Sequence, residues 1–107
     1  MAVFGFSDDA ADVVSFRKAI FRMILSRAKE RLTDPADIKE LDVSEATDGI
    51  SFELLDDAQR ARLVEAVYQG TRDLRQQVAD GRPTEEPVRD GAVEKLDEIL
   101  SLLSRFR

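Results

Sequence analysis

The sequence of 107 residues contains no cysteine and no histidine. Without cysteine the chain has no disulfide framework and no thiolate metal site. Without histidine it has no imidazole base, no Ser-His-Asp triad and none of the Glu-x-x-His pairs of di-iron helical bundles. No GxxxxGK[ST] or GxGxxG motif is present, so no glycine loop is available to bind phosphate groups. The residue content therefore favours a protein that is not an enzyme and uses no metal and no cofactor.

Long apolar runs are also missing. The longest apolar-rich stretch, from Ala19 to Leu25, is interrupted by Arg22 and is far too short to span a bilayer. The first residues, MAVFGFSDDAADVV, lack a basic segment and carry three aspartates, so they do not resemble a secretory signal. The absence of cysteine suits a reducing compartment. These features predict a cytoplasmic protein with no membrane partner.

The length and composition are those of a single folded domain over residues 1–107. Hydrophobic residues make up 43% of the chain and charged residues 36%, a balance typical of a small globule with a modest core. Three segments, over about 8–32, 56–80 and 90–106, repeat apolar residues at the spacing of an amphipathic helix. The predicted fold is all-α: a three-helix, mostly antiparallel bundle with an elaborated acidic connector between the first two helices.

The first predicted helix has an unusually wide apolar face. At 100° per residue its apolar side chains cover an arc of about 200°, wider than the stripe of an ordinary surface helix. Lys18, Arg22 and Lys29 lie on the opposite arc. An arc of this width needs cover on two sides, so we expect a homodimer that buries part of it.

The connector, residues 33–55, has weaker signals. Asp34 followed by Pro35 predicts a short helix that reaches Leu41. Asp48-Gly49 is a turn signal, and the residues on either side of it alternate between apolar and polar. This pattern suits either a small β-hairpin or an extended segment that inserts Ile50, Phe52 and Leu54 into the ends of the helices.

Negative charge is concentrated in this connector. Residues 33–57 carry nine acidic side chains against the single base Lys39, while the whole chain has a net charge of −6. A calcium loop placed on Gly49 fails, because Ser44, Ala46 and Leu55 would occupy three of its most important ligand positions. The connector is therefore a candidate docking surface for a basic protein partner. The partner-binding residues that we predict are Asp42, Glu45, Asp48, Phe52, Glu53 and Asp56.

Binding to nucleic acid is not favoured. The sequence pI is about 4.7, whereas nucleic-acid-binding domains are usually basic. The bases of the first helix are expected to pair with the acids of the protein itself or to face solvent.

These features together favour a small, acidic, non-enzymatic interaction module. In size and charge the chain is similar to small acidic helical inhibitors of nucleic-acid-degrading toxins, although it shares no motif with them. An immunity or antitoxin protein that binds its partner through the connector is the leading hypothesis. The alternative is a structural or adaptor subunit that forms a homo-oligomer through the wide apolar face of the first helix.

Overall fold

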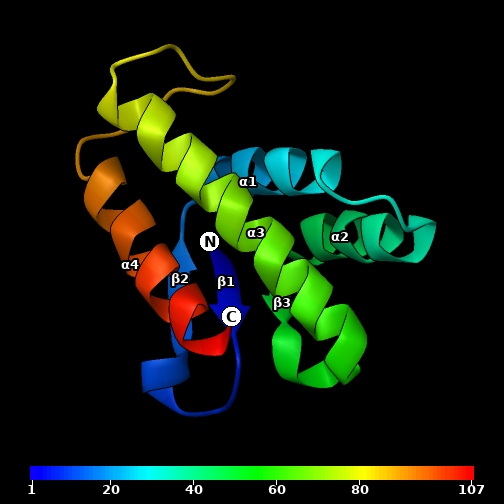
Figure 1. Ribbon diagram of the computed structural model, residues 1–107. Helices are drawn as coiled ribbons and strands as arrows, with labels where there is room; N and C mark the ends of the chain where they lie inside the picture. The colour runs from blue at the N-terminus through cyan, green and yellow to red at the C-terminus, as the bar shows by residue number, and fades with distance from the viewer.

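The computed structural model describes all residues, 1–107, and combines four α-helices with a three-stranded mixed sheet (Figure 1). The predicted all-α bundle is therefore wrong, and the fold class is α+β. The strands are β1 (Ala2–Gly5), β2 (Val13–Phe16) and β3 (Gly49–Ser51). The helices are α1 (Lys18–Glu30), α2 (Pro35–Thr47), α3 (Asp57–Ala79) and α4 (Ala92–Phe106), with short 3₁₀ turns at Ala10–Asp12 and Phe52–Leu54.

The main error lies in the first predicted helix, whose N-terminal part is a strand. β2 pairs antiparallel with β1, and α1 begins only at Lys18. Within β2, Val14 and Phe16 are buried while Val13 and Ser15 are exposed, which is the two-residue alternation of a strand with one covered face. The same apolar residues also fit a helical arc, so the local pattern alone favoured the helix.

The small β-hairpin around Asp48-Gly49, one of the two alternatives for the connector, is absent. β3 pairs in parallel with β1, which lies far away in the sequence, and the strand order is β2-β1-β3. Asp48 ends α2 in the left-handed conformation, with φ of 61°, and so turns the chain directly into β3. A Cβ atom on Gly49 would lie 2.9 Å from the backbone oxygen of Val3, so a close approach of two backbones requires glycine there.

Helix α2 is longer than the short helix that we predicted, although its start is as expected. The Asp34 side chain accepts a hydrogen bond from the Ala36 N–H at 2.9 Å, and Pro35 occupies the first turn. The helix continues past Leu41 to Thr47, through residues that we had expected to be extended.

Helices α3 and α4 lie close to the predicted positions. Asp56 caps α3 by accepting a hydrogen bond from the Gln59 N–H at 2.8 Å. Gly70 of α3 lies against α1, where a Cβ atom would be 3.0 Å from the Ile24 backbone oxygen. The glycine therefore allows the two helices to pack closely. None of the helices has the length and apolar content needed to cross a bilayer.

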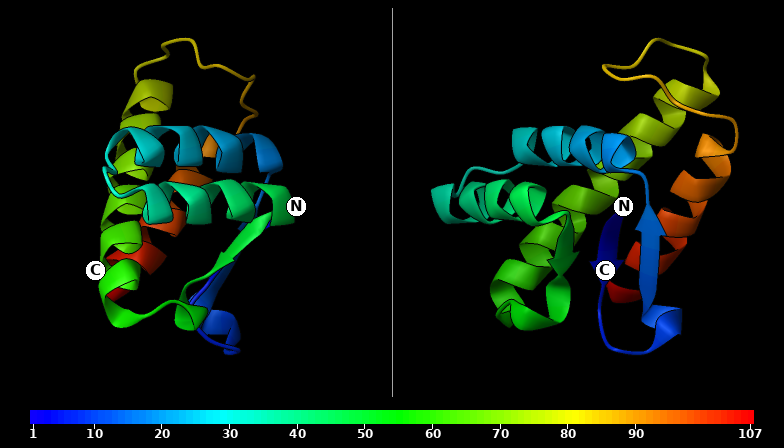
Figure 2. Two further views of the ribbon diagram at one scale, coloured as in Figure 1. Left: turned by 90° about the vertical axis from the view of Figure 1, so that its right-hand side faces the viewer. Right: turned by 180° about the vertical axis from the view of Figure 1, so that it is seen from behind.

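The helices cover one face of the sheet and leave the other open. Seen from behind, no helix crosses in front of β2 (Figure 2, right). The covered face carries Phe4, which packs edge-on against the rings of Phe16, Phe21 and Phe52 at centroid distances of 4.8–5.8 Å. This aromatic cluster joins the sheet to α1 and to the segment after β3.

The apolar residues of α1 are covered within the chain. All seven of its apolar residues between Ala19 and Ala28 are at most 8% exposed. The wide arc that suggested a homodimer was also overestimated, because Val13, Val14 and Phe16 belong to β2. The expected homodimer interface on this helix is thus not available, and the oligomeric state itself stays a prediction.

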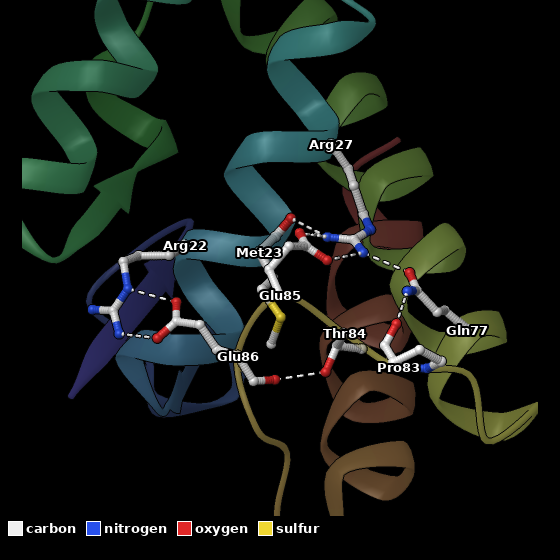
Figure 3. A network of polar contacts seen from close by, with 8 residues as sticks. All are labelled: Arg22, Met23, Arg27, Gln77, Pro83, Thr84, Glu85 and Glu86. Atoms are coloured by element: carbon white, nitrogen blue, oxygen red, sulfur yellow. Dashed lines mark hydrogen bonds and ion pairs between the residues drawn. The ribbon is translucent and has the colours of Figure 1, made fainter.

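The connection between α3 and α4 crosses α1 as a strap without regular structure. Figure 3 shows how two forked ion pairs hold it down. Arg22 donates to both carboxylate oxygens of Glu86 at 2.6 and 2.8 Å, and Arg27 donates to those of Glu85 at 2.8 and 2.9 Å. These pairs join two bases of α1 to acids of the protein itself.

Candidate functional site

The candidate site lies where α2, β3 and the start of α3 meet, and a buried ion pair positions α2 there. Asp37 is the one acidic side chain of the chain that is fully buried. Arg62 of α3 donates to its two oxygens at 2.7 and 3.1 Å, and Gln59 adds a donor at 3.2 Å. The hydrogen bonds from Arg62 lower the pKa of Asp37 below its usual value, against the opposing effect of burial.

A second arginine shapes the turn that follows β3. The Arg60 guanidinium donates to the backbone oxygens of Phe52, Glu53 and Leu55, at 2.9, 3.3 and 2.7 Å. Three carbonyl groups of one short turn are thus held by a single planar side chain. Because the backbone of the turn is fixed, the side chains that it carries have a defined direction.

The result of this arrangement is an open groove of about 470 Å³ beside β3. Its apolar part contains two side chains that are unusually exposed, Val43 at 49% and Leu54 at 81%. Glu40 and Asp56 supply its charge, and no basic side chain lines it. The full lining consists of Glu40, Val43, Ser44, Thr47, Gly49, Ser51, Leu54, Leu55, Asp56 and Gln59. An apolar centre with an acidic border is the composition that would receive a basic, partly apolar segment of a protein.

The structure does not bring the six predicted partner-binding residues together. Phe52 is completely buried and stacks on Phe6 at a centroid distance of 4.5 Å, so it is a core residue and is not available to a partner. Asp56 lines the groove, and Glu53 is exposed on the turn next to Leu54. Of the six, only these two carboxylates belong to the groove or its border.

The other three predicted residues lie on the side of α2 that faces α1. Asp42 pairs with Lys29 at 2.5 Å, and Asp48 pairs with Lys18 at 3.0 Å. Glu45 has no ion-pair partner. The pKa of Arg22 is raised mainly by its hydrogen bond to Glu86, and the charge of Glu45 adds a smaller contribution. The expectation that the bases of the first helix pair with acids of the protein itself is confirmed at Lys18, Arg22 and Lys29.

Most of the connector's acidic side chains have partners within the same chain. Two cap helices and four form ion pairs with bases, which leaves three of the nine without a partner. Those three are Glu40, Glu45 and Glu53. The net charge of −8 falls to −4 when the four pairing bases are counted with the segment. No three acidic side chains gather in the geometry of a metal site.

Sequence reasoning missed Val43 and Leu54 as surface residues. One of the two alternatives for the connector inserted Leu54 into the ends of the helices. The 3₁₀ turn at Phe52–Leu54 instead points Leu54 outward and lets Leu55 pack against the core. Val43 falls outside the inward face of α2, which is formed by Asp37, Leu41 and Ser44. These three residues are spaced three or four apart, as on one side of a helix, and this spacing was the only indication in the sequence that Val43 lies on the exposed side.

Comparison with protein-family models, with curated proteins and with solved structures gives no match to this chain.

Proposed function

We propose that this protein is a non-enzymatic interaction module that binds a basic segment of a protein partner in the groove between α2 and residues 51–56. The partner segment would present lysine or arginine side chains to Glu40, Glu53 and Asp56 and an apolar side chain to Val43 and Leu54. Acidic residues at the border would speed the encounter, while the apolar centre would supply most of the affinity.

The observation that carries this proposal is the exposure of Leu54. Leu54 is 81% exposed, so its apolar surface would leave water when a partner covers it, which favours binding. Arg60 holds the surrounding turn through three carbonyl groups, so ordering this leucine on binding would cost little conformational entropy.

The acidic groove also suggests the type of interaction module. A small acidic module that covers a basic surface of a larger protein would act as an immunity or antitoxin type of inhibitor. We place it in the cytoplasm, since a chain without cysteine suits a reducing compartment.

A short amphipathic peptide of leucine and lysine, labelled with a fluorophore, is a suitable probe for this groove. Leu54→Ser should weaken its binding about tenfold, which corresponds to ~1.4 kcal/mol. Replacing Glu40 and Glu53 together by glutamine should weaken binding at low salt, and the loss should shrink at about 0.5 M salt because of screening.

The matched control replaces two exposed acids outside the groove, by Asp8→Asn together with Glu94→Gln. It removes the same amount of charge and should leave the affinity almost unchanged. If the control pair and the groove pair weaken binding equally, the peptide responds only to net charge and the proposed groove is wrong.

A further inference from the structure

The sheet has a free edge at β2, on the side opposite the acidic groove. In the order β2-β1-β3, β2 pairs only with β1, so its other edge has no strand beside it (Figure 1). Strands at such edges usually carry lysine, proline or a bulge that prevents further pairing. The residues of β2, VVSF, include none of these protections.

The hydrogen-bond pattern identifies the backbone groups at this edge. The Phe6 N–H donates to the Asp12 oxygen at 3.0 Å, so the backbone groups of Asp12 face the strand β1 and its extension. In an antiparallel pair, every second residue directs both its N–H and its C=O to the same neighbouring strand. Val14 and Phe16 therefore face β1, whereas Ser15 directs its N–H and its C=O outward. The Val13 N–H is used by the preceding turn, but its C=O also points outward.

Two hollows between β2 and α4 lie along this edge. The one at the start of β2 has about 380 Å³ and is lined by Val13, Val14 and Leu102 among others. The one at the end of β2 has about 330 Å³, and Phe16 and Ile20 form part of its apolar lining. Side chains that point to the same face of an added strand would be about 7 Å apart, so two alternate side chains could enter the two hollows.

The hollow at the end of β2 is basic, in contrast to the rest of this acidic protein. Twelve of the sixteen lysine and arginine side chains form ion pairs, and Arg17, Lys39, Arg72 and Arg89 do not. Two of these four, Arg17 and Arg89, line this one hollow together with Lys95. Asp90 is the single acid in its lining. An acidic group placed there would meet two arginines that have no carboxylate partner.

We infer that the groove between β2 and α4 binds an extended acidic segment of a second protein, which adds to the sheet as a strand antiparallel to β2. Ser15 supplies the main-chain hydrogen bonds. An acidic side chain of the ligand lies between Arg17 and Arg89, and an apolar side chain two residues later enters the hollow beside Leu102. This site is separate from the groove of the proposed function and has the opposite charge.

The test uses ¹⁵N-labelled protein and the acetylated, amidated peptide Thr-Glu-Thr-Val-Thr, with Thr-Lys-Thr-Val-Thr for comparison. The acidic peptide should shift the amide resonances of Ser15 and of residues 89–95, and the basic peptide should not. Replacing Arg17 and Arg89 together by glutamine should weaken binding about tenfold. The matched control, Lys39→Gln with Arg72→Gln, removes the other two unpaired bases and should have little effect.

Strand addition is tested separately from charge. Ser15→Pro removes the outward N–H, and it should abolish binding while β1 and β2 stay paired. If that variant does not fold, the acidic peptide methylated on the nitrogen of its central residue gives the same test from the ligand side.

Three results would overturn the inference. The first is that millimolar acidic peptide causes no shift at Ser15. The second is that neither Ser15→Pro nor methylation of the peptide changes binding. The third is that copies of this protein associate with one another and that Ser15→Pro prevents the association. The last result would make a second copy the occupant of the edge.

Discussion

Replacing Arg62 by methionine should destabilise the protein far more than replacing its partner Asp37 by leucine. The two side chains differ in exposure: that of Asp37 is 1% exposed, whereas that of Arg62 is 48% exposed. In Arg62→Met the buried carboxylate loses two of its three hydrogen bonds and keeps only Gln59. In Asp37→Leu the guanidinium is left without a partner, but it remains half in water.

The expected magnitudes follow from this asymmetry. Stranding a buried charge costs about 3–5 kcal/mol, and the remaining bond from Gln59 places Arg62→Met near ~3 kcal/mol. Asp37→Leu replaces a buried charge by an apolar side chain of similar size and should cost about 1 kcal/mol or less. The double variant should be more stable than Arg62→Met alone, because it contains no stranded carboxylate.

The stability of the native protein and that of Arg62→Met should change with pH in opposite directions. In the native protein the pKa of Asp37 is lowered on folding, so its contribution to stability is present above the unfolded pKa and is lost as the pH falls through the folded one. In Arg62→Met burial acts without the arginine and should raise that pKa above its unfolded value. The stability of this variant should then decrease as the pH rises from about 4 to about 7.

Urea unfolding followed by circular dichroism measures these differences directly. Equal losses for Arg62→Met and Asp37→Leu, or a stability of Arg62→Met that does not fall between about pH 4 and pH 7, would refute the reasoning.

Three further predictions concern packing and charge. Gly70→Ala should destabilise the protein by about 1 kcal/mol in urea unfolding despite the better helix propensity of alanine, because its Cβ would lie 3.0 Å from a backbone oxygen of α1. Phe52→Ala should cost about 3–5 kcal/mol, whereas Leu54→Ala should change the stability by less than about 0.5 kcal/mol, and equal losses would contradict the opposite placement of the two side chains. Glu65 has a pKa lowered to about 2, mainly by a hydrogen bond from Arg107, so Arg107→Leu should raise that pKa in an NMR titration; an unchanged value would contradict the pairing.

Local signals in the sequence were sufficient for α3 and α4 but not for the N-terminal third. Asp56 and its bond to the Gln59 N–H lie within one helical turn, so the start of α3 could be predicted from neighbouring residues. β1 pairs in parallel with β3, and Phe4 lies opposite Ile50. A pairing between residues so far apart leaves no local pattern. Val14 and Phe16 fit a helical and an extended period equally well, and only the presence of β1 decides between them.

The candidate site was predictable in charge but not in geometry. The density of acids in residues 33–57 is a property of the sequence, whereas their partners come from other helices, as in the pairs of Asp42 with Lys29 and of Asp37 with Arg62. Phe52 and Leu54 are two residues apart in an apparent strand, yet a 3₁₀ turn buries one and exposes the other. The direction of each side chain depends on Arg60, whose role is visible only in the folded chain.

The measurement that tests the central claim most directly is NMR mapping of the leucine and lysine peptide on ¹⁵N- and methyl-labelled protein. If the groove between α2 and residues 51–56 is the docking site, the largest shifts should occur at the methyl groups of Val43 and Leu54 and at the amides of Thr47 and Ser51. Shifts spread evenly over the exposed acids of all four helices, with the Leu54 methyl groups unchanged, would contradict the account.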